Sequence, residues 1–495
     1  MVGTIAHDMI MNLLTTLYIL SACVLALYTL GHGILLVQYL RKRGQGSQAD
    51  VAPLEMYPPV TVQLPVYNER HVALRLIDAV AMLDYPADKL QIQILDDSTD
   101  STTGSIARHI RQYAHLDIVH VRRPKREGYK AGALAYGLKQ TTAPYVAIFD
   151  ADFIPATDFL QRTIPYLEQD GQLGFVQTRW GHLNPTDNAL TRAQVIAIDN
   201  HFVIEQAGRH LSEWMVPFNG TGGVWRVKTI ADAGGWSAGT LTEDLDLSFR
   251  AQLKGWHVHY LPDLVVPGEL PPQLAAYRQQ QARWAKGGSQ CLRKLGKSVW
   301  ASDKRLSTKL IATHHLMQYV PQLLMLVMLL LTPLLIISDM LRYIPLAPLG
   351  IIGLIPPVMY VVSQQAIGGR WLARLAAFPA LLLLGTGLIW QNAIAVVSGF
   401  FLAHGEFRRT PKFASDWQAS GYALRAQVAI VVQIAFMVYS AWGLSVAWQA
   451  AGALVPYFGV HVLSFGLVAL WDIHDEWRLR QAMPKQQLLP ESGSD

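Results

Sequence analysis

Long apolar segments near both ends of the 495-residue chain constrain its fold more than any other feature. They lie at about 9–40, 311–338, 349–364, 377–402, 424–449 and 453–471. Crossing a bilayer takes roughly 20 apolar residues, so several of these segments are long enough to span one. The composition agrees, because 51% of the residues are hydrophobic, 16% are charged and the mean hydropathy is +0.21. The sequence therefore predicts an integral membrane protein with a substantial polar part at about 50–300.

The first apolar segment is predicted to be a retained membrane anchor. The basic run RKR at 41–43 follows it, whereas no Lys or Arg precedes it. A cleavable signal peptide would carry its positive charge in front of the apolar run. Because basic flanks stay on the cytoplasmic side of a membrane, we expect the short N-terminus outside and the chain after residue 41 in the cytoplasm.

The segment at 377–402 is predicted to be a re-entrant or interfacial element. Basic residues flank it on both sides: Arg370, Arg374, Arg408, Arg409 and Lys412. Both flanks therefore favour the cytoplasm. The segment also contains Gln391 and Asn392, which are costly in lipid without partners. This interpretation leaves about five spans with the C-terminus inside, and a sixth full span is the alternative.

Short apolar runs alternate with helix-like stretches in the polar part of the chain. The runs are at 60–65, 90–95, 117–121 and 145–149, and the helix-like stretches are near 70–83, 101–113 and 130–140. This alternation predicts a parallel sheet with helices on both faces, a Rossmann-like α/β fold. Ligands of such sheets bind beyond the carboxyl ends of the strands.

Acidic residues follow three of these predicted strands, in PVYNE at 65–69, DDSTD at 96–100 and DAD at 150–152. Carboxylates gathered on one rim repel one another unless they receive a cation or hydrogen-bond donors. A nucleotide sugar together with Mg²⁺ or Mn²⁺ would supply both, since these ions bind one or two carboxylates plus substrate phosphates. Lys130 is a cation suited to the diphosphate, although a solvated lysine at a helix start is the simpler explanation.

Two further motifs each allow a structural and a catalytic interpretation. In TED at 242–244, Thr242 can cap a helix with Glu243 and Asp244 in its first turn. Sugar transfer also needs a base to deprotonate the acceptor hydroxyl, and Asp244 is a candidate. In QQARW at 280–284, Trp284 and Arg283 are either interfacial anchors at the end of a polar helix or ligands of the sugar and its diphosphate.

Taken together and in this order, the motifs resemble those of processive family 2 glycosyltransferases, a group that includes bacterial cellulose synthase and the plant mannan and glucomannan synthases. The shared pattern is D, DxD, TED and Q(Q/R)xRW, with further likeness in GYKAGAL, FNGTGGVWR and ELPPQLAAYRQQQARW. The resemblance covers about residues 58–300. It implies a GT-A-type catalytic domain inserted between transmembrane segments.

The resemblance also implies roles for individual residues. Asp244 would be the general base, with Glu243 beside it, and Asp150 and Asp152 would hold the nucleotide and its Mg²⁺ or Mn²⁺. The base and ribose would contact Tyr67, Glu69 and Asp97. The diphosphate would contact Lys130. The acceptor and diphosphate would contact Asn219, Gly220, Thr221, Gln280, Arg283 and Trp284. FRRTPK at 407–412 resembles a gating loop, with Thr410 and Lys412 in matching places, although Arg409 replaces an apolar residue and Pro411 intrudes.

The predicted organisation has five parts: an anchor at 1–43, a cytoplasmic glycosyltransferase domain at 50–270, amphipathic interface helices at 271–310, a transmembrane region at 311–472 with a gating-like loop at 404–413, and a cytoplasmic tail at 473–495. The expected enzyme resides in a plasma or inner membrane. It is expected to transfer hexose from GDP-mannose or UDP-glucose to a β-linked polysaccharide, with β-1,4 as the expected linkage, to invert the anomeric centre and to translocate the product.

Two other functions remain open on the sequence alone. A membrane lipid such as ceramide or diacylglycerol could replace the polysaccharide as acceptor, or the chain could be a sugar transporter with a regulatory nucleotide-binding domain. Nucleic acid is not an expected partner, because the net charge is only +5 and no basic stripe is interleaved with aromatic residues. Cys23 and Cys291 predict neither a disulfide framework nor a metal site.

Overall fold

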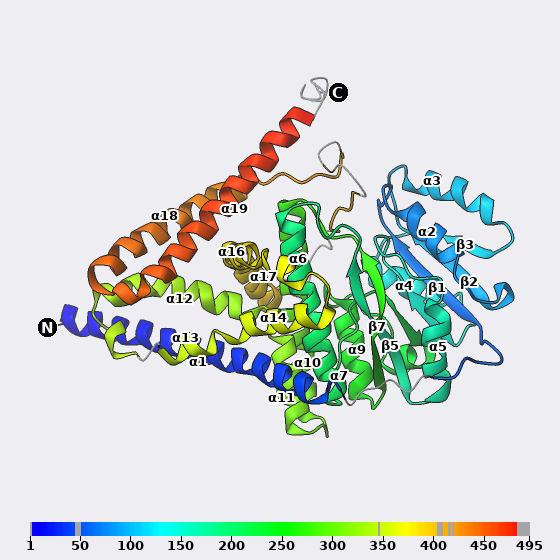
Figure 1. Cartoon of the computed structure of the whole chain (residues 1–495), viewed down its shortest axis with the longest axis horizontal. Helices are drawn as coiled ribbons and strands as arrows, with labels where there is room; N and C mark the ends of the chain where they lie inside the picture. Colours follow the sequence, from blue (N-terminus) through cyan, green and yellow to red (C-terminus); the bar gives the residue numbers. More distant parts are fainter. Residues whose placement is uncertain are drawn as a thin grey trace.

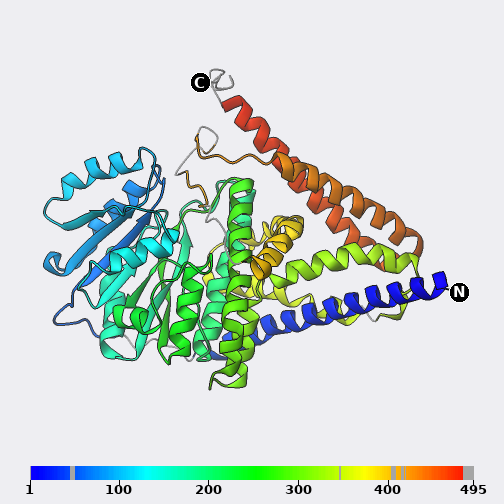
Figure 2. The same cartoon turned by 180° about the vertical axis from the view of Figure 1, so that it is seen from behind.

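The computed structural model describes residues 2–44, 51–344, 347–402, 409–413, 417 and 420–482. An α/β part with a single twisted sheet occupies one side of the molecule, and long helices extend away from it on the other side (Figures 1 and 2). Helix α10 (Leu274–Ala301) lies between the two parts and contacts both. Most residues that shape the candidate site come from the ends of the strands, from the helix at 243–253, from α10 and from the segment 409–413, which precedes the last two long helices.

The sheet has seven strands in the order β3-β2-β1-β4-β6-β5-β7. The strands are β1 (Val60–Val66), β2 (Leu90–Asp96), β3 (Asp117–Val121), β4 (Tyr145–Ile148), β5 (Leu173–His182), β6 (Gly223–Arg226) and β7 (His257–Gly268). The four predicted strands are confirmed within one residue at each end, as β1 to β4, and they pair in parallel.

The prediction of an all-parallel sheet is wrong at β6, which runs antiparallel to both β4 and β5. The chain reaches β6 through the loop 217–222, whose Gly222 donates to the last residue of β4, Ile148. Since this loop already lies at the carboxyl rim, β6 can only run back down the sheet. The mixed sheet therefore places FNGT, at 218–221, on the same rim as the ends of β1 and β4.

Helices cover both faces of the sheet, as predicted. One core joins the sheet to α2 (Ala73–Ala81), α3 (Thr102–His109) and α5 (Phe159–Gln169). A second core, on the opposite face, joins it to α4 (Tyr129–Leu138), α8 (Val227–Asp232) and α9 (Glu243–Leu253). Fully buried Val62 and Leu64 in the first core and Val146 and Ile148 in the second fix the register of the central strands.

The remaining helices belong largely to the apolar segments. They are α1 (Val2–Lys42), α6 (Ala189–Asn200), a π-helix (His201–Gln206), α7 (Ala207–Leu211), α11 (Leu306–Leu316), α12 (Val320–Ile337), α13 (Ala347–Ile352), α14 (Ile355–Ile367), α15 (Trp371–Leu375), α16 (Phe378–Gly387), α17 (Ile389–Phe401), α18 (Gln427–Ala450) and α19 (Val455–Ala482). The stretch at 311–338, expected as one apolar segment, is divided between α11 and α12. Pro321 lies in the first turn of α12, where its missing N–H is tolerated, and a new helix begins there.

Among the described residues, five helices are long and apolar enough to cross a membrane: 6–42, 320–337, 350–367, 427–450 and 452–481. A sixth candidate, 371–387 with 389–401, is bent by 51° at its break. A bent pair suits either a broken span or a re-entrant element, so the predicted re-entrant element at 377–402 stays a prediction. The last helix continues to Ala482, which places 473–482 of the predicted tail in helix, and 483–495 lie outside the described residues.

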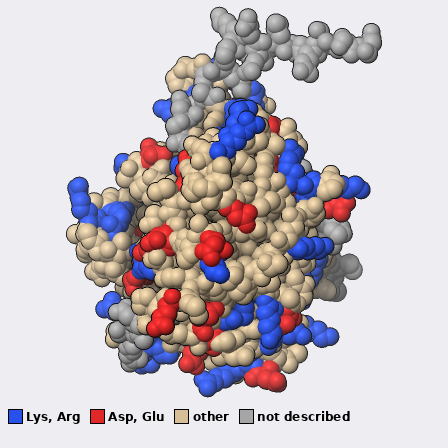
Figure 3. Space-filling model, turned by 90° about the vertical axis from the view of Figure 1, so that its right-hand side faces the viewer, with Lys and Arg blue, Asp and Glu red and all other residues tan. Residues whose placement is uncertain are grey.

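The two parts of the molecule differ in their surfaces. The face of the α/β part that points away from the long helices carries Lys, Arg, Asp and Glu interspersed (Figure 3). The long helices instead expose large apolar side chains, including Leu13, Leu27, Val428 and Leu463, each more than 60% exposed. Exposed apolar side chains of this kind fit a hydrocarbon surrounding. Several apolar helices could therefore span a membrane, with the α/β part beside it.

Candidate active site

A cavity opens at the carboxyl rim of the sheet, where β1, β4 and β7 end against α9 and α10. Fifteen of the sequence-predicted residues line it: Tyr67, Glu69, Asp97, Lys130, Asp150, Asp152, Asn219, Gly220, Glu243, Asp244, Gln280, Arg283, Trp284, Thr410 and Lys412. They come from segments up to 345 residues apart, counting from Tyr67 to Lys412. The fold therefore brings the separate motifs to one place.

Asp150 and Asp152 follow β4 and are each paired with a lysine. The Nζ of Lys130 lies 2.5 Å from Asp150 Oδ1, and the Nζ of Lys412 lies 2.7 Å from Asp152 Oδ2. Burial and the Asp152 carboxylate raise the pKa of Asp150, while Lys130 opposes this. Burial alone would lower the pKa of Lys130, but the carboxylates of Asp150 and Glu243 outweigh it and the pKa is raised.

Thr221 does not line the cavity, contrary to the prediction. Its side chain is fully buried, and its Oγ1 accepts a hydrogen bond of 2.9 Å from the backbone N–H of Asp150. The reason is the direction of the loop before β6: Asn219 and Gly220 point to the cavity, whereas Thr221 points into the sheet. Thr221 therefore holds the backbone of Asp150 in place.

Two arginines that sequence reasoning missed contact predicted site residues, and one of them, Arg126, lines the cavity. Arg123 donates from Nε to Asp97 Oδ1 at 2.7 Å and from Nη2 to Asp97 Oδ2 at 2.6 Å. The guanidinium of Arg126 lies over the Tyr67 ring, 3.4 Å from its centroid. Both come from the basic run RRPKR at 122–126, directly after β3. That position, at a carboxyl strand end, was the available signal.

The segment 409–413 covers the cavity from the side of the long helices. Thr410 and Lys412 are buried at its edge, and Lys412 Nζ donates to the carbonyl of Glu269 at 2.5 Å. Arg409, at the position where an apolar residue was expected, forms an ion pair of 2.8 Å with Glu69 and lies over the ring of Tyr422. The first two residues of the predicted gating motif at 407–412 lie outside the described residues.

Asp244 lies in the first turn of α9, as predicted, and faces the cavity. Burial and the neighbouring Glu243 carboxylate raise its pKa to about 7. The backbone of Gly220 passes so close that a Cβ there would stand 2.8 Å from Asp244 Oδ2, and the φ of Gly220 is +83°. Only glycine fits this approach. Thr242 occupies the N-cap position but makes no capping hydrogen bond with its side chain, so the predicted cap is wrong.

QQARW lies in the middle of α10 and not at the end of a helix, because α10 continues to Ala301. Its Gln280 and Trp284 also border a second cavity, which Asn219 and Asp244 share with the first. The second cavity extends toward α11 and is lined there by His315, Gln318 and Tyr319 among others. Asp244 and Trp284 therefore stand where the two cavities meet.

The two carboxylates after β4 fit a divalent cation that also binds a substrate. Carboxylate oxygens suit Mg²⁺ and Mn²⁺, which complete their shells with phosphate oxygens and water. Among the described residues, no group of three or more His, Cys, Asp or Glu side chains is gathered for a metal. The protein alone thus offers Asp150 and Asp152, and the remaining ligands would have to come with the donor.

Comparisons with known proteins indicate the family of the α/β part. Residues 58–287 match the family described as glycosyltransferase like family 2. The probable glucomannan 4-beta-mannosyltransferase 3 of Oryza sativa subsp. japonica is 45% identical over 249 residues, which are 49% of this chain and 45% of the relative. Glucomannan 4-beta-mannosyltransferase 1 of Cyamopsis tetragonoloba is 40% identical over 278 residues, 54% of this chain and 53% of the relative.

The chain spans about half the length of these curated relatives. Among solved structures, a mannosyltransferase of Pyrobaculum calidifontis in complex with GDP-Man and Mn²⁺ superimposes with a TM-score of 0.52 at 21% identity, covering 78% of this chain and 99% of that one. This likeness supports the GT-A-like fold. Residues 58–287 are therefore a glycosyltransferase domain of family 2 that resembles the plant mannan synthases.

Proposed function

We propose that the chain is a membrane-embedded hexosyltransferase that extends a β-1,4-linked mannan or glucomannan. The hexose comes from a nucleotide diphosphate sugar, with GDP-mannose as the first candidate and UDP-glucose as the second. The observation that carries this proposal is the meeting of all four motif groups in one cavity. A transporter with a regulatory nucleotide domain would not need a carboxylate such as Asp244 at the junction of two cavities.

The relatives support the choice of product. Those that match residues of the α/β part are named glucomannan 4-beta-mannosyltransferases, at 40 to 45% identity. The structural neighbour with the same fold binds GDP-Man and Mn²⁺. Together they favour mannose over glucose and a metal-dependent reaction.

The residues divide the work between the two cavities. In the first, Tyr67, Arg126 and Asp97 surround the nucleoside, and Lys130 and Arg283 bind the diphosphate. At the junction, Asp244 accepts the proton of the acceptor hydroxyl while that oxygen attacks the anomeric carbon. The attack comes from the side opposite the bond to the leaving nucleoside diphosphate, so this single displacement inverts the anomeric configuration. In the second cavity, the Trp284 ring provides a stacking surface for the terminal sugar of the acceptor.

A divalent cation would be held by Asp150 and Asp152. When bound, Mg²⁺ or Mn²⁺ neutralises the charge that develops on the leaving diphosphate. Lys130 and Lys412 now pair with these acids at 2.5 and 2.7 Å, and both can move to the phosphates once the donor arrives. The two carboxylates and the two lysines therefore suit a donor whose negative phosphates bind together with a divalent cation.

The second cavity offers the product a way toward the helical part. Its far wall includes His315 of α11 and Gln318 and Tyr319 before α12, so a chain leaving Trp284 would enter between apolar helices. Polar side chains along this wall suit the hydroxyls of a sugar polymer. We therefore propose that synthesis and translocation are coupled in this one chain, with the α/β part in the cytoplasm of a plasma or inner membrane.

The test is transfer by the purified full-length protein in lipid nanodiscs, with radiolabelled GDP-mannose and UDP-glucose supplied separately. We expect incorporation from GDP-mannose into a polymer that β-mannanase digests. EDTA should abolish incorporation, and added Mn²⁺ or Mg²⁺ should restore it. An organic-soluble product with a single sugar would show that the acceptor is a lipid and not a polymer. No transfer from either donor would overturn the proposed function.

The pH dependence of the rate provides a separate prediction. Asp244 accepts a proton only when it is ionised, and its ionised fraction increases as the pH rises through its pKa of about 7. The kcat at saturating donor should therefore rise with pH over this range. Because the Glu243 carboxylate raises the pKa of Asp244, Glu243→Gln should move the rising limb to lower pH. A limb that stays in place in Glu243→Gln would contradict this coupling.

A further inference from the structure

A second carboxylate follows Asp244 on α9 and plays no part in the site described above. Asp246 is fully buried and lies away from the cavity lining. Residues two apart are separated by about 200° around a helix axis, so Asp244 and Asp246 point in nearly opposite directions. A fully buried carboxylate is costly unless cations and hydrogen bonds compensate it.

Two cations from two different helices, Arg250 of α9 and Lys294 of α10, compensate Asp246. Its Oδ2 accepts a hydrogen bond of 2.9 Å from Nε of Arg250, one turn further along α9. Its Oδ1 forms an ion pair of 2.8 Å with Nζ of Lys294, which belongs to α10. The carboxylate of Asp246 therefore ties α9 to α10.

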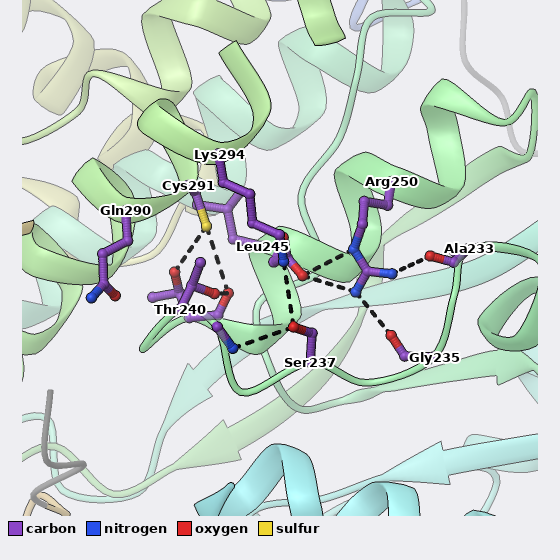
Figure 4. A network of polar contacts seen from close by, with 12 residues as sticks. Ala233, Gly235, Ser237, Thr240, Leu245, Arg250, Gln290, Cys291 and Lys294 are labelled. Carbon is purple, nitrogen blue, oxygen red and sulfur yellow. Dashed lines mark hydrogen bonds and ion pairs between the residues drawn. The ribbon is translucent and has the colours of Figure 1, made fainter. Parts of the chain in front are cut away.

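The same two cations hold the loop that precedes α9 (Figure 4). Arg250 donates to the carbonyl of Ala233 and, at 2.9 Å, to that of Gly235. Lys294 donates to Ser237 Oγ at 3.4 Å. The loop thus has its start fixed to α9 and its middle fixed to α10.

The end of this loop is pressed against α10 directly before Asp244. The Oε1 of Gln290 accepts a hydrogen bond of 2.9 Å from the backbone N–H of Leu241. The Oγ1 of Thr242 and the Sγ of Cys291 are 3.4 Å apart. A Cβ on Gly287 would lie 2.5 Å from Thr242 Cγ2, so the helix offers no room for a side chain there.

Helix α10 also carries the cavity residues Arg283 and Trp284, two to three turns before Lys294. We infer that Asp246 and Lys294 are positioning residues, whose ion pair holds α9 and the preceding loop on α10 and so fixes the Asp244 carboxylate relative to Arg283 and Trp284. This inference rests on the proposed function, in which Asp244 is the base. It assigns to the second aspartate of EDLD, at 243–246, a purpose that is separate from binding the donor.

Cys291 provides a readout of the clamp that does not depend on activity. Its thiol is fully buried beneath Thr242, whereas Cys23, the other cysteine of the sequence, can be replaced by serine. In a Cys23→Ser background, Lys294→Met should speed labelling of Cys291 by a water-soluble maleimide about tenfold or more, as expected for the loss of one charge-assisted hydrogen bond. Lys294→Arg should restore slow labelling, and Lys297→Met, at an exposed position one turn away, should leave it unchanged.

Kinetics test whether the clamp positions Asp244. Lys294→Met should lower kcat about ten- to a hundredfold, because a displacement of about 1 Å at the reacting groups has effects of this size, with the donor KM unchanged. Labelling at the parent rate would overturn the clamp, and faster labelling with an unchanged kcat would overturn its positioning role. If the parent protein transfers no sugar from either donor, the proposed function fails, whereas the labelling rates still decide whether Lys294 holds the loop.

Discussion

Asp244→Asn should lower sugar transfer by about 10²–10⁴-fold, the usual contribution of a general base. The amide keeps the size of the carboxylate but cannot accept the proton of the acceptor hydroxyl. Asp244 is half-buried beside Glu243 and Gly220, and no other carboxylate stands at the junction of the two cavities in the described part of the chain. Rates with labelled donor measure the loss, and the control is Asp232→Asn, which makes the same change at an exposed position.

Donor binding separates a missing base from a damaged fold. Lys130 donates to the carbonyl of Gly220 and lies beside Asp150, and neither contact requires the charge of Asp244. The affinity for the nucleotide diphosphate, measured by calorimetry, should therefore stay within about threefold of the parent, less than 1 kcal/mol. Full transfer activity in Asp244→Asn would remove Asp244 from the role of base.

The half of the sheet made of β3, β2, β1 and β4 was predictable because its strands have clear apolar patterns. Val60–Val66 and Leu90–Asp96 carry an apolar residue at nearly every second position, and Tyr145–Ile148 is a continuous apolar run. β5 and β7 were missed for the opposite reason. Their pairing shifts register between Thr178 and Arg179, and β7 contains Pro262 and Pro267, so neither strand has a regular alternation.

The sequence predicted the cavity residues that belong to its motifs. It did not predict the contacts that depend on tertiary packing. The strand-end acids and Trp284 lie in the cavity because parallel strands end on one rim and α10 crosses it. Arg123 and Arg409 were missed as partners of Asp97 and Glu69, since each pair joins segments that only the fold brings together. Thr221 was misplaced because a short loop can point successive side chains to opposite sides.

Asp152→Asn should be the second most damaging change, with a loss of at least about a hundredfold, since a bound cation contributes several kcal/mol to stabilising transition-state charge. Asparagine keeps an oxygen ligand but removes the charge that would attract Mg²⁺ or Mn²⁺. The variant should therefore need a higher Mn²⁺ concentration for half-maximal activity and should reach a lower maximum. Metal titrations of the initial rate measure both effects.

The ion pair between Asp152 and Lys412 allows the effect of Asp152→Asn on the metal to be separated from its effect on the lysine. Asp152 Oδ2 binds Lys412 Nζ at 2.7 Å, so in Asp152→Asn the lysine loses this carboxylate and keeps the carbonyl of Glu269, whereas Lys130 and Asp150 stay paired. Lys412→Met should raise the donor KM and leave the Mn²⁺ requirement unchanged, because it removes a cation and no metal ligand. Asp158→Asn, at a half-exposed site beside Arg162, is the matched control and should behave as the parent. A parent-like Mn²⁺ titration in Asp152→Asn would place the metal elsewhere, and Asp152 would then serve only to hold Lys412 and the segment 409–413 at the rim.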